Sequence, residues 1–148
     1  MTPQVLAACL LFAANTYQLP PQALIAIMHV EGGRVGQSVG PNSNGSYDLG
    51  PMQVNTLWVP KLAKIWGTDR ETAHRRVRDN GCVNIHVAAW ILRQRVNDTG
   101  NLYKGIAAYH SYTPVHGNRY LQKVVVAMRR LGFLTADNRP AKSSAPQG

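Results

Sequence analysis

The chain has 148 residues, the length of one ordinary domain. Hydrophobic residues make up 45% of it and charged residues 16%, which favours a packed core and excludes a disordered polar chain. The formal net charge of +9 implies an anionic partner, which on charge alone is nucleic acid, acidic lipid or anionic cell wall.

The first third of the chain predicts two helices separated by a proline break. Val5 to Tyr17 carry apolar residues at three- and four-residue spacings, which indicates one face of a helix. No Lys or Arg precedes this stretch, so we interpret it as a first helix rather than a signal peptide, and a leader removed upstream stays an open alternative. Pro21 can begin the second helix, which contains Leu24 to Val30 and Glu31 and ends at Gly32-Gly33.

The remainder predicts a long loop followed by further helices, and the fold class is mostly α. Residues 33–51 are rich in Gly, Ser, Asn and Pro, show no strand alternation, and form a loop of a length that is usually functional. A second loop is expected over 109–117. The later helical patterns cover 56–66, a short helix with a Thr68–Glu71 capping box, 85–96, 102–108 and 120–131. We expect a domain over 1–134 and a disordered, proline-rich tail over 135–148.

The chain contains only two glutamates, Glu31 and Glu71, and their surroundings differ. Glu71 lies among arginines and an aspartate, as expected for a cap on a solvated helix. Glu31 follows an apolar run and directly precedes the long loop, so burial should disfavour its charged form and raise its pKa. A general acid for glycosidic cleavage needs such a raised pKa. An exposed carboxylate at a helix end is the alternative, and position alone does not choose between them.

Four segments, in order along the chain, resemble lytic transglycosylases with a lysozyme-like fold. Residues 44–55, Asn-Gly-Ser-Tyr-Asp-Leu-Gly-Pro-Met-Gln-Val-Asn, resemble the Gly-Leu-Met-Gln-Ile-Asn signature that follows the catalytic glutamate of the family. The other three are similar to its central helix, its Ala-Tyr-Asn-Ala segment and its closing helix, and they are residues 84–92, 107–111 and 119–124. The similarity covers residues 9 to about 130 and extends to the small branch associated with secretion, conjugation and pilus machinery.

The resemblance implies a single lysozyme-like helical domain with a substrate cleft between the Glu31 helix and the Tyr109 loop. Glu31 would protonate the MurNAc–GlcNAc β-1,4 glycosidic oxygen and then act as a base, giving 1,6-anhydro-MurNAc without a cofactor or a metal. The implied protein is periplasmic and opens peptidoglycan strands locally for a secretion, conjugation or pilus system. No integral membrane segment is expected, because no apolar stretch is long enough to span a bilayer.

The chain has two cysteines, Cys9 and Cys82. Composition leaves their state open, because such a pair is a set of buried thiols in a cytosolic protein and a disulfide in an exported one. The resembling branch carries one cysteine at the start of the first helix and another before the central helix. The resemblance therefore implies a Cys9–Cys82 disulfide, which would stabilise the fold by roughly 4 kcal/mol in the chain-entropy model.

The resemblance assigns substrate contacts by position to Ser46, Met52, Gln53, Tyr109 and His110. Gln53 corresponds to a glutamine in the cleft, Met52 to a methionine that lines it, and Tyr109 to a tyrosine whose hydroxyl lies near the catalytic carboxylate. A buried structural role is the alternative for Met52 and for Tyr109. Ser46 is a candidate for the serine that contacts the N-acetyl group. His110 replaces an asparagine and can titrate near neutral pH.

Three further residues are candidates for secondary roles. Asp48 either organises the loop by accepting hydrogen bonds from backbone N–H groups or faces Glu31 and positions water as in a lysozyme. Asn55 either caps the following helix, which we favour, or binds substrate. Tyr120 belongs to the closing Arg-Tyr motif.

Three competing interpretations of the function stay open. The nearest is a hydrolytic muramidase with the same acid, in which Asp48 is the discriminating residue. A weakly active wall-binding assembly factor is suggested by departures from the family pattern at Gly32, Pro51 and His110. A helical DNA-binding protein is suggested by the arginines of residues 70–78, but a solvated helix explains them and no nucleic-acid partner is expected.

Overall fold

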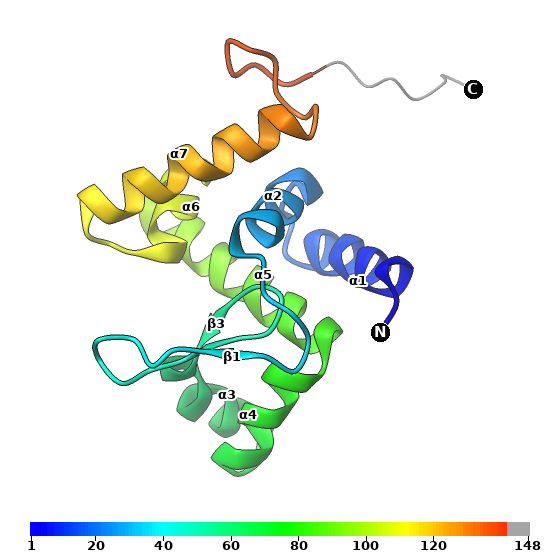
Figure 1. Cartoon of the computed structure of the whole chain (residues 1–148), viewed down its shortest axis with the longest axis vertical. Helices are drawn as coiled ribbons and strands as arrows, with labels where there is room; N and C mark the ends of the chain where they lie inside the picture. The colour runs from blue at the N-terminus through cyan, green and yellow to red at the C-terminus, as the bar shows by residue number, and fades with distance from the viewer. Residues whose placement is uncertain (142–148) are drawn as a thin grey trace.

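The computed structural model describes residues 1–141, which form a mostly helical single domain as predicted (Figure 1). Its helices are α1 (Pro3–Thr16), α2 (Pro21–Glu31), α3 (Val59–Trp66), α4 (Arg70–Asp79), α5 (Gly81–Thr99), α6 (Leu102–His110) and α7 (Pro114–Arg130). Its strands are β1 (Ser38–Val39), β2 (Asp48–Leu49) and β3 (Val54–Asn55), and a 3₁₀ turn, η1 (Thr56–Trp58), precedes α3. None of the helices in this described part is long and apolar enough to cross a membrane.

Helix α5 runs through the middle of the molecule, and α1, α4 and α6 pack against it (Figure 1). Its side chains Ile85, Ala88 and Leu92 are fully buried, and their three- and four-residue spacing places them on one face. The side-chain oxygen of Asn80 accepts hydrogen bonds from the first backbone N–H groups of the helix, and Gly100 ends the helix in a left-handed conformation. The central helix therefore carries the core and provides a rigid base for the loop that follows α2.

The segment predicted as one long loop contains a small antiparallel sheet of order β1-β2-β3. Leu49 pairs with Val54 in the sheet, and both side chains are buried in the core. Asp48 pairs with Asn55, and these two side chains lie on the opposite, partly exposed face. The prediction that this segment lacks strands is wrong, because strands of two residues are too short to show alternation.

Two predicted boundaries need correction. The cap of α4 is Asp69 rather than Thr68, since the Asp69 carboxylate accepts a hydrogen bond from the Thr72 backbone N–H at 2.6 Å. Helix α6 continues through Tyr109 to His110, so these residues lie on its last turn and not in a loop. Their side chains are consequently fixed by a helical backbone.

The predicted disordered tail begins with an ordered turn. The Thr135 backbone N–H donates to the Arg139 carbonyl at 2.7 Å, and the Ala141 N–H donates to the Phe133 carbonyl at 3.0 Å. Residues 135–141 therefore do not fit the prediction of disorder. The remainder of the predicted tail, 142–148, lies outside the described residues.

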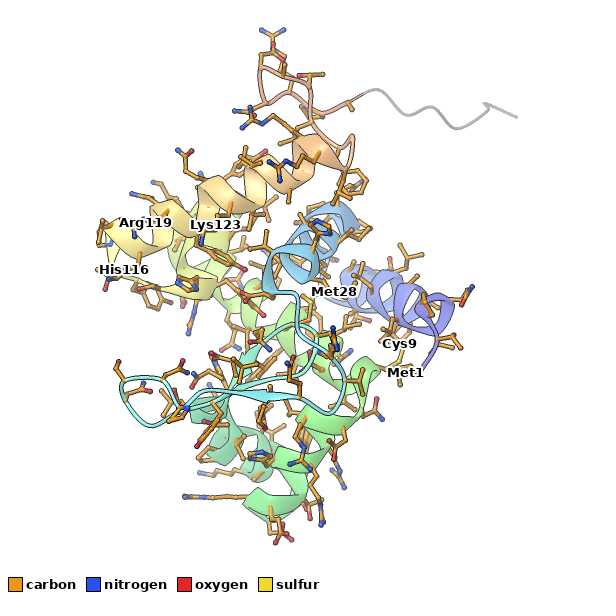
Figure 2. The ribbon with its side chains drawn as sticks, viewed as in Figure 1. Met1, Cys9, Met28, His116, Arg119 and Lys123 are labelled. Carbon is orange, nitrogen blue, oxygen red and sulfur yellow. A yellow bond between two sulfur atoms is a disulfide. The ribbon has the colours of Figure 1, made fainter. Side chains whose placement is uncertain are left out.

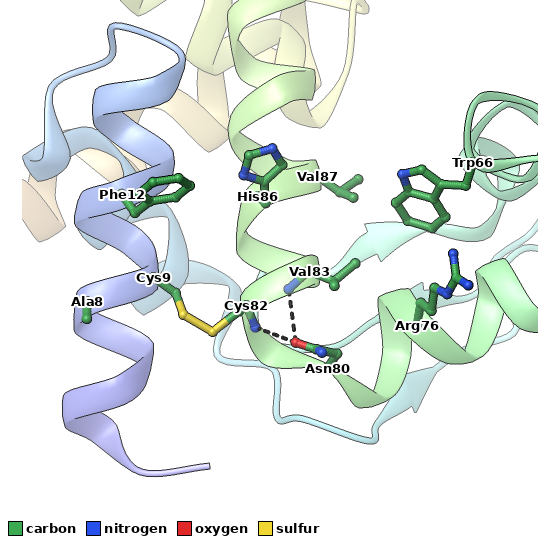
Figure 3. Close-up of a pocket in the computed structure, with 10 residues that line it drawn as sticks. All are labelled: Ala8, Cys9, Phe12, Trp66, Arg76, Asn80, Cys82, Val83, His86 and Val87. Atoms are coloured by element: carbon green, nitrogen blue, oxygen red, sulfur yellow. Dashed lines mark hydrogen bonds between the residues drawn. A yellow bond between two sulfur atoms is a disulfide. The ribbon is translucent and has the colours of Figure 1, made fainter.

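A disulfide joins Cys9 of α1 to Cys82 of α5, as the resemblance implied (Figure 3). The two Cα atoms are 5.3 Å apart, within the usual range for a disulfide. The bond closes a loop with a sequence separation of 73 residues, which contains α2, the whole sheet, α3 and α4. It therefore links the amino-terminal helix directly to the central one.

The turn between β2 and β3 is fixed to α5 by the side chain of Asn84, which is fully buried. Its oxygen accepts a hydrogen bond from the Met52 backbone N–H at 2.8 Å, and its amide nitrogen donates to the carbonyls of Leu49 and Val77. Gly50 passes so close that a Cβ atom there would lie 2.4 Å from the Asn84 amide nitrogen. This contact sets the position of the turn relative to α5.

Candidate active site

A cleft of about 810 Å³ lies between the end of α2, the β1–β2 hairpin, α3, α5 and the α6–α7 connection. Most of the residues singled out in the sequence line it, namely Glu31, Ser46, Asp48, Gln53, Asn55, Tyr109 and His110. Met52 and Tyr120 are not part of its lining. Residues far apart in the sequence thus come together around Glu31, and a cleft beside the Glu31 helix was predicted.

Glu31 is the last residue of α2, because Gly32 adopts a left-handed conformation (φ 63°) that ends the helix. The pKa of the Glu31 carboxyl is raised from its ordinary value of 4.5 to about 7, chiefly by burial and to a smaller extent by the negative charge of Asp48. The hydrogen bond from Tyr120 and the positive charge of Lys123 act in the opposite direction. Near neutral pH the carboxyl is therefore present in both the acid and the base form.

Lys123 lies on α7 together with His116 and Arg119 (Figure 2). No role of its own was predicted for Lys123. Its three-residue spacing from Tyr120 nevertheless places the two residues on one side of the helix. That spacing was the sequence signal from which a role of Lys123 could have been predicted. In the structure, α7 brings both the Tyr120 hydroxyl and the Lys123 positive charge to Glu31.

The loop after α2 approaches the end of that helix closely at Gly33. A Cβ atom on Gly33 would lie only 2.0 Å from the carbonyl oxygen of Gly50, so any other residue would displace the β2–β3 turn. The same turn holds Gln53, whose side-chain nitrogen donates to the Gly50 carbonyl at 3.0 Å. Within the described residues the Gln53 side-chain oxygen has no hydrogen-bond partner and remains available to a ligand in the cleft.

The hydroxyl that contacts Glu31 belongs to Tyr120. The resemblance had instead implied that the hydroxyl near this carboxylate is that of Tyr109. Tyr120 donates a hydrogen bond of 2.8 Å to the Glu31 carboxylate. The Tyr109 hydroxyl instead donates to the backbone carbonyl of Met52 at 2.9 Å, and its ring stacks on that of Tyr120. Tyr109 therefore does not donate its hydroxyl to Glu31, although it lies close enough that the charge of Glu31, after burial, helps to raise the pKa of Tyr109.

His110 stacks on the other tyrosine of this pair. Its ring is nearly parallel to that of Tyr120, with the ring centroids 4.7 Å apart. Partial burial and the nearby charge of Lys123 lower the pKa of His110 below its ordinary value. The imidazole is therefore mainly neutral at pH 7 and lines the cleft as a stacking and hydrogen-bonding group.

Two residues predicted to contact substrate are placed differently by the structure. The side chain of Met52 is fully buried in the core, so only its backbone takes part in the site. The hydroxyl of Ser46 donates to Asn44 and accepts hydrogen bonds from Asn42 and Asn55. A hydroxyl has one donor and two acceptor positions, so Ser46 has none left for an N-acetyl group in this conformation.

Asp48 belongs to the same polar network of the hairpin. Its two oxygens accept hydrogen bonds from the side-chain amides of Asn42 and Asn55, at 3.2 and 3.1 Å. Asp48 thus organises the loop as expected, but through amide side chains rather than backbone N–H groups. Asn55 also caps η1 by accepting a hydrogen bond from the Leu57 N–H, in agreement with the favoured interpretation. Asn42 was not among the predicted site residues, because a lone asparagine in a polar loop carries no distinguishing signal.

A second hollow, of about 730 Å³, lies where α1, α4 and α5 meet beside the disulfide (Figure 3). Phe12, Trp66 and His86 are among its lining residues, and no carboxylate is. This hollow therefore lacks the acid that glycosidic cleavage requires, whereas the cleft holds both Glu31 and Asp48.

Comparisons with known proteins agree with the resemblance seen in the sequence. Residues 8–124 match the family model described as "Transglycosylase SLT domain". The invasion protein IagB of Salmonella typhimurium (strain SL1344) is 26% identical over 142 residues, which cover 93% of this chain and 86% of that protein. Protein IpgF of Shigella flexneri is 30% identical over 101 residues, which cover 68% of this chain and 63% of IpgF. The chain belongs to the transglycosylase SLT domain family.

Proposed function

We propose that the protein is a peptidoglycan lytic transglycosylase in which Glu31 is the catalytic acid and base. The observation that carries the proposal is a partly buried carboxyl with a pKa of about 7 that lines a cleft of about 810 Å³. In the acid form Glu31 donates a proton to the oxygen of the MurNAc–GlcNAc β-1,4 bond, and the bond to the anomeric carbon breaks. The membership of the chain in its family supports peptidoglycan as the substrate.

The second half of the proposed reaction needs no water. After the leaving sugar has taken the proton, the Glu31 carboxylate removes a proton from the 6-hydroxyl of the muramic acid. The oxygen of that hydroxyl then bonds to the anomeric carbon, which gives the 1,6-anhydro product and restores the acid form of Glu31. A pKa near 7 suits a group that must both give and take a proton in one cycle. Gln53 contributes its free side-chain oxygen for substrate binding.

A hydrolytic muramidase is the second candidate, and the position of Asp48 favours it. Asp48 lines the same cleft, and its charge acts on Glu31. Its carboxylate oxygens accept one hydrogen bond each, which leaves lone pairs that can hold a water or stabilise positive charge on the sugar. In the lytic transglycosylase mechanism, by contrast, Glu31 is the one catalytic carboxylate and Asp48 only organises the hairpin.

Mass spectrometry of the muropeptides released from purified peptidoglycan separates these candidates. A lytic transglycosylase releases 1,6-anhydro-muropeptides, whose mass is lower by one water than that of the reducing-end products of a muramidase. We expect the anhydro products. Reducing ends would contradict the proposal and assign a direct role to Asp48. Wall binding without release would instead favour an assembly factor.

The setting that we propose is local wall opening in the periplasm for a secretion, conjugation or pilus system. The name of the Salmonella relative, an invasion protein, supports a role beside such machinery. The disulfide supports an oxidising compartment, because cytosolic thiols are kept reduced. The net charge of +9 suits an enzyme that works on the anionic wall.

The hydrogen bond from Tyr120 makes a prediction for the pH profile of the activity. It stabilises the ionised form of Glu31, so Tyr120→Phe should raise the pKa of Glu31 above its present value of about 7. The alkaline limb of the rate–pH profile should therefore move up by about one pH unit, the equivalent of one hydrogen bond to a charged group. The profile of kcat/KM between pH 5 and pH 9 measures this.

Tyr103→Phe is the matched control, because Tyr103 is an exposed tyrosine on α6 and does not line the cleft. Its profile should coincide with that of the unmodified protein. A Tyr120→Phe profile that falls at all pH values without moving would show that the hydroxyl does not tune Glu31.

A further inference from the structure

One wall of the cleft carries cations held against aromatic rings, a group that we call the cation–aromatic wall (Trp58, Lys61, Trp90, Arg95 and Tyr112). Trp58 and Trp90 pack edge to face with their ring centroids 5.5 Å apart. The Lys61 ammonium lies 5.7 and 5.5 Å from the centroids of these two rings. The Arg95 guanidinium lies 5.1 Å from the centroid of Trp58 and 4.8 Å from that of Tyr112. All but Trp90 line the same cleft as Glu31.

The two cations of this wall differ in their internal partners. Arg95 lies 3.7 Å from the Asp98 carboxylate, which also accepts a hydrogen bond from Tyr112, so part of its charge is neutralised within the protein. Lys61 is exposed, and no carboxylate in residues 1–141 forms an ion pair with it. Its attraction to two indole rings holds the ammonium in place at the cleft. The wall therefore presents a positioned positive charge to whatever binds there.

The chemistry of the wall favours an anion over a neutral sugar ring. A sugar that binds an indole does so against an open ring face, but Lys61 and Arg95 both lie over the ring of Trp58. The N-acetyl sugar rings of the glycan strand carry no charge, and the lactyl group of muramic acid is a neutral amide wherever a peptide is attached, whereas the peptide itself carries free carboxylates. An ammonium and a carboxylate form a charge-assisted hydrogen bond, which is stronger than one between neutral groups.

We propose that Lys61, with Arg95 beside it, binds a free carboxylate of the muramic acid peptide. This inference rests on the proposed function, since it assigns a further part of the same substrate to the same cleft. As a result the enzyme selects glycan strands whose peptides carry a free carboxylate over strands on which no carboxylate is free. The charges that act directly on Glu31 are those of Asp48 and Lys123, so this selection works through binding rather than through the proton of Glu31.

The test compares kcat/KM on three substrates. They are peptide-bearing strands, strands whose peptides are removed by an amidase and whose freed lactyl carboxylates are then converted to amides, and peptide-bearing strands whose carboxylates are converted to amides. The wild-type protein should cleave the first substrate about 3- to 10-fold faster than either of the others, the range expected for one exposed charge-assisted contact. In Lys61→Gln this ratio should fall to about one. Lys64→Gln, a charge change elsewhere on α3 that does not line the cleft, should keep the wild-type ratio.

A ratio between substrates is insensitive to the fraction of folded protein, so a partly unfolded variant does not mimic the expected result. Equal rates of the wild-type protein on all three substrates would overturn the inference and leave the proposed function intact. A wild-type ratio that persists in Lys61→Gln would also overturn it. Failure of the wild-type protein to cleave any substrate would instead contradict the proposed function on which the inference depends.

Discussion

Replacement of Glu31 by glutamine is expected to reduce the release of muropeptides by about 10³-fold, the usual loss when a general acid and base is removed. The amide keeps the shape of the carboxyl but can neither donate an acidic proton nor accept one at neutral pH. Initial rates on purified peptidoglycan measure the loss. Glu71→Gln is the control, because Glu71 is an exposed glutamate on α4, and its ion pair with Arg75, the only one it forms within residues 1–141, is a surface pair 3.7 Å long.

The same variant provides its own test of folding, because the raised pKa of Glu31 affects stability. A carboxyl whose pKa rises from 4.5 to about 7 on folding stabilises the protein fully only below pH 4.5, and this contribution is lost as the pH rises through 7. At pH 8 the loss corresponds to about 3 kcal/mol. Glu31→Gln should therefore be more stable than the wild-type protein at pH 8 and of similar stability at pH 4.

Urea denaturation at the two pH values measures this difference. A variant that is inactive but more stable at pH 8 would show that the lost activity comes from the missing acid. An inactive variant that is less stable at both pH values would mean that Glu31 is needed for the fold, and the catalytic assignment would lose its support.

Removal of the Cys9–Cys82 disulfide is expected to lower the free energy of unfolding by about 4 kcal/mol. The bond closes a loop with a sequence separation of 73 residues, and an open chain has far more conformations than a closed one. For a chain of this size the loss corresponds to a fall in Tm of about 10 °C. Thermal unfolding with and without a reductant measures the change in the wild-type protein.

The double variant Cys9→Ser with Cys82→Ser is the matched control for the reductant. It should unfold at the lower temperature in both conditions, because it has no bond to reduce. A wild-type protein whose Tm does not respond to reduction would mean that the bond is absent in solution or adds nothing to stability. The disulfide lines the second hollow and not the cleft, so the protein that remains folded should keep its activity.

Much of the fold follows from local signals in the sequence. Apolar spacing predicted the helices, and glycines or prolines gave several of their ends, such as Pro21 at the start of α2 and Gly100 after α5. The apolar run before Glu31 suggested the direction of its pKa shift but left an exposed carboxylate open, and the structure shows that burial is the largest cause of the shift. The mostly α fold class was confirmed. These features could be predicted because each of them depends on residues close together in the sequence.

The errors about the site concern contacts between distant segments. Tyr120 lies 89 residues beyond Glu31, and no local pattern shows which of the two neighbouring tyrosines points its hydroxyl at the carboxylate. Met52 and Ser46 occupy signature positions, but the core takes one side chain and the hairpin network takes the other. The cation–aromatic wall was missed for the same reason, since Lys61 and Trp90 come from separate helices.

The dependence of Glu31 on α7 has a consequence for biosynthesis. The hydroxyl and the positive charge that act on Glu31 both come from this late helix, so a nascent chain already contains the acid long before its partners have been synthesised. A truncated product that ends before Tyr120 retains Glu31 and Asp48 but lacks the group that holds the carboxyl in place. The pKa of Glu31 on which the proposed function depends is therefore reached only after α7 has been synthesised and has docked.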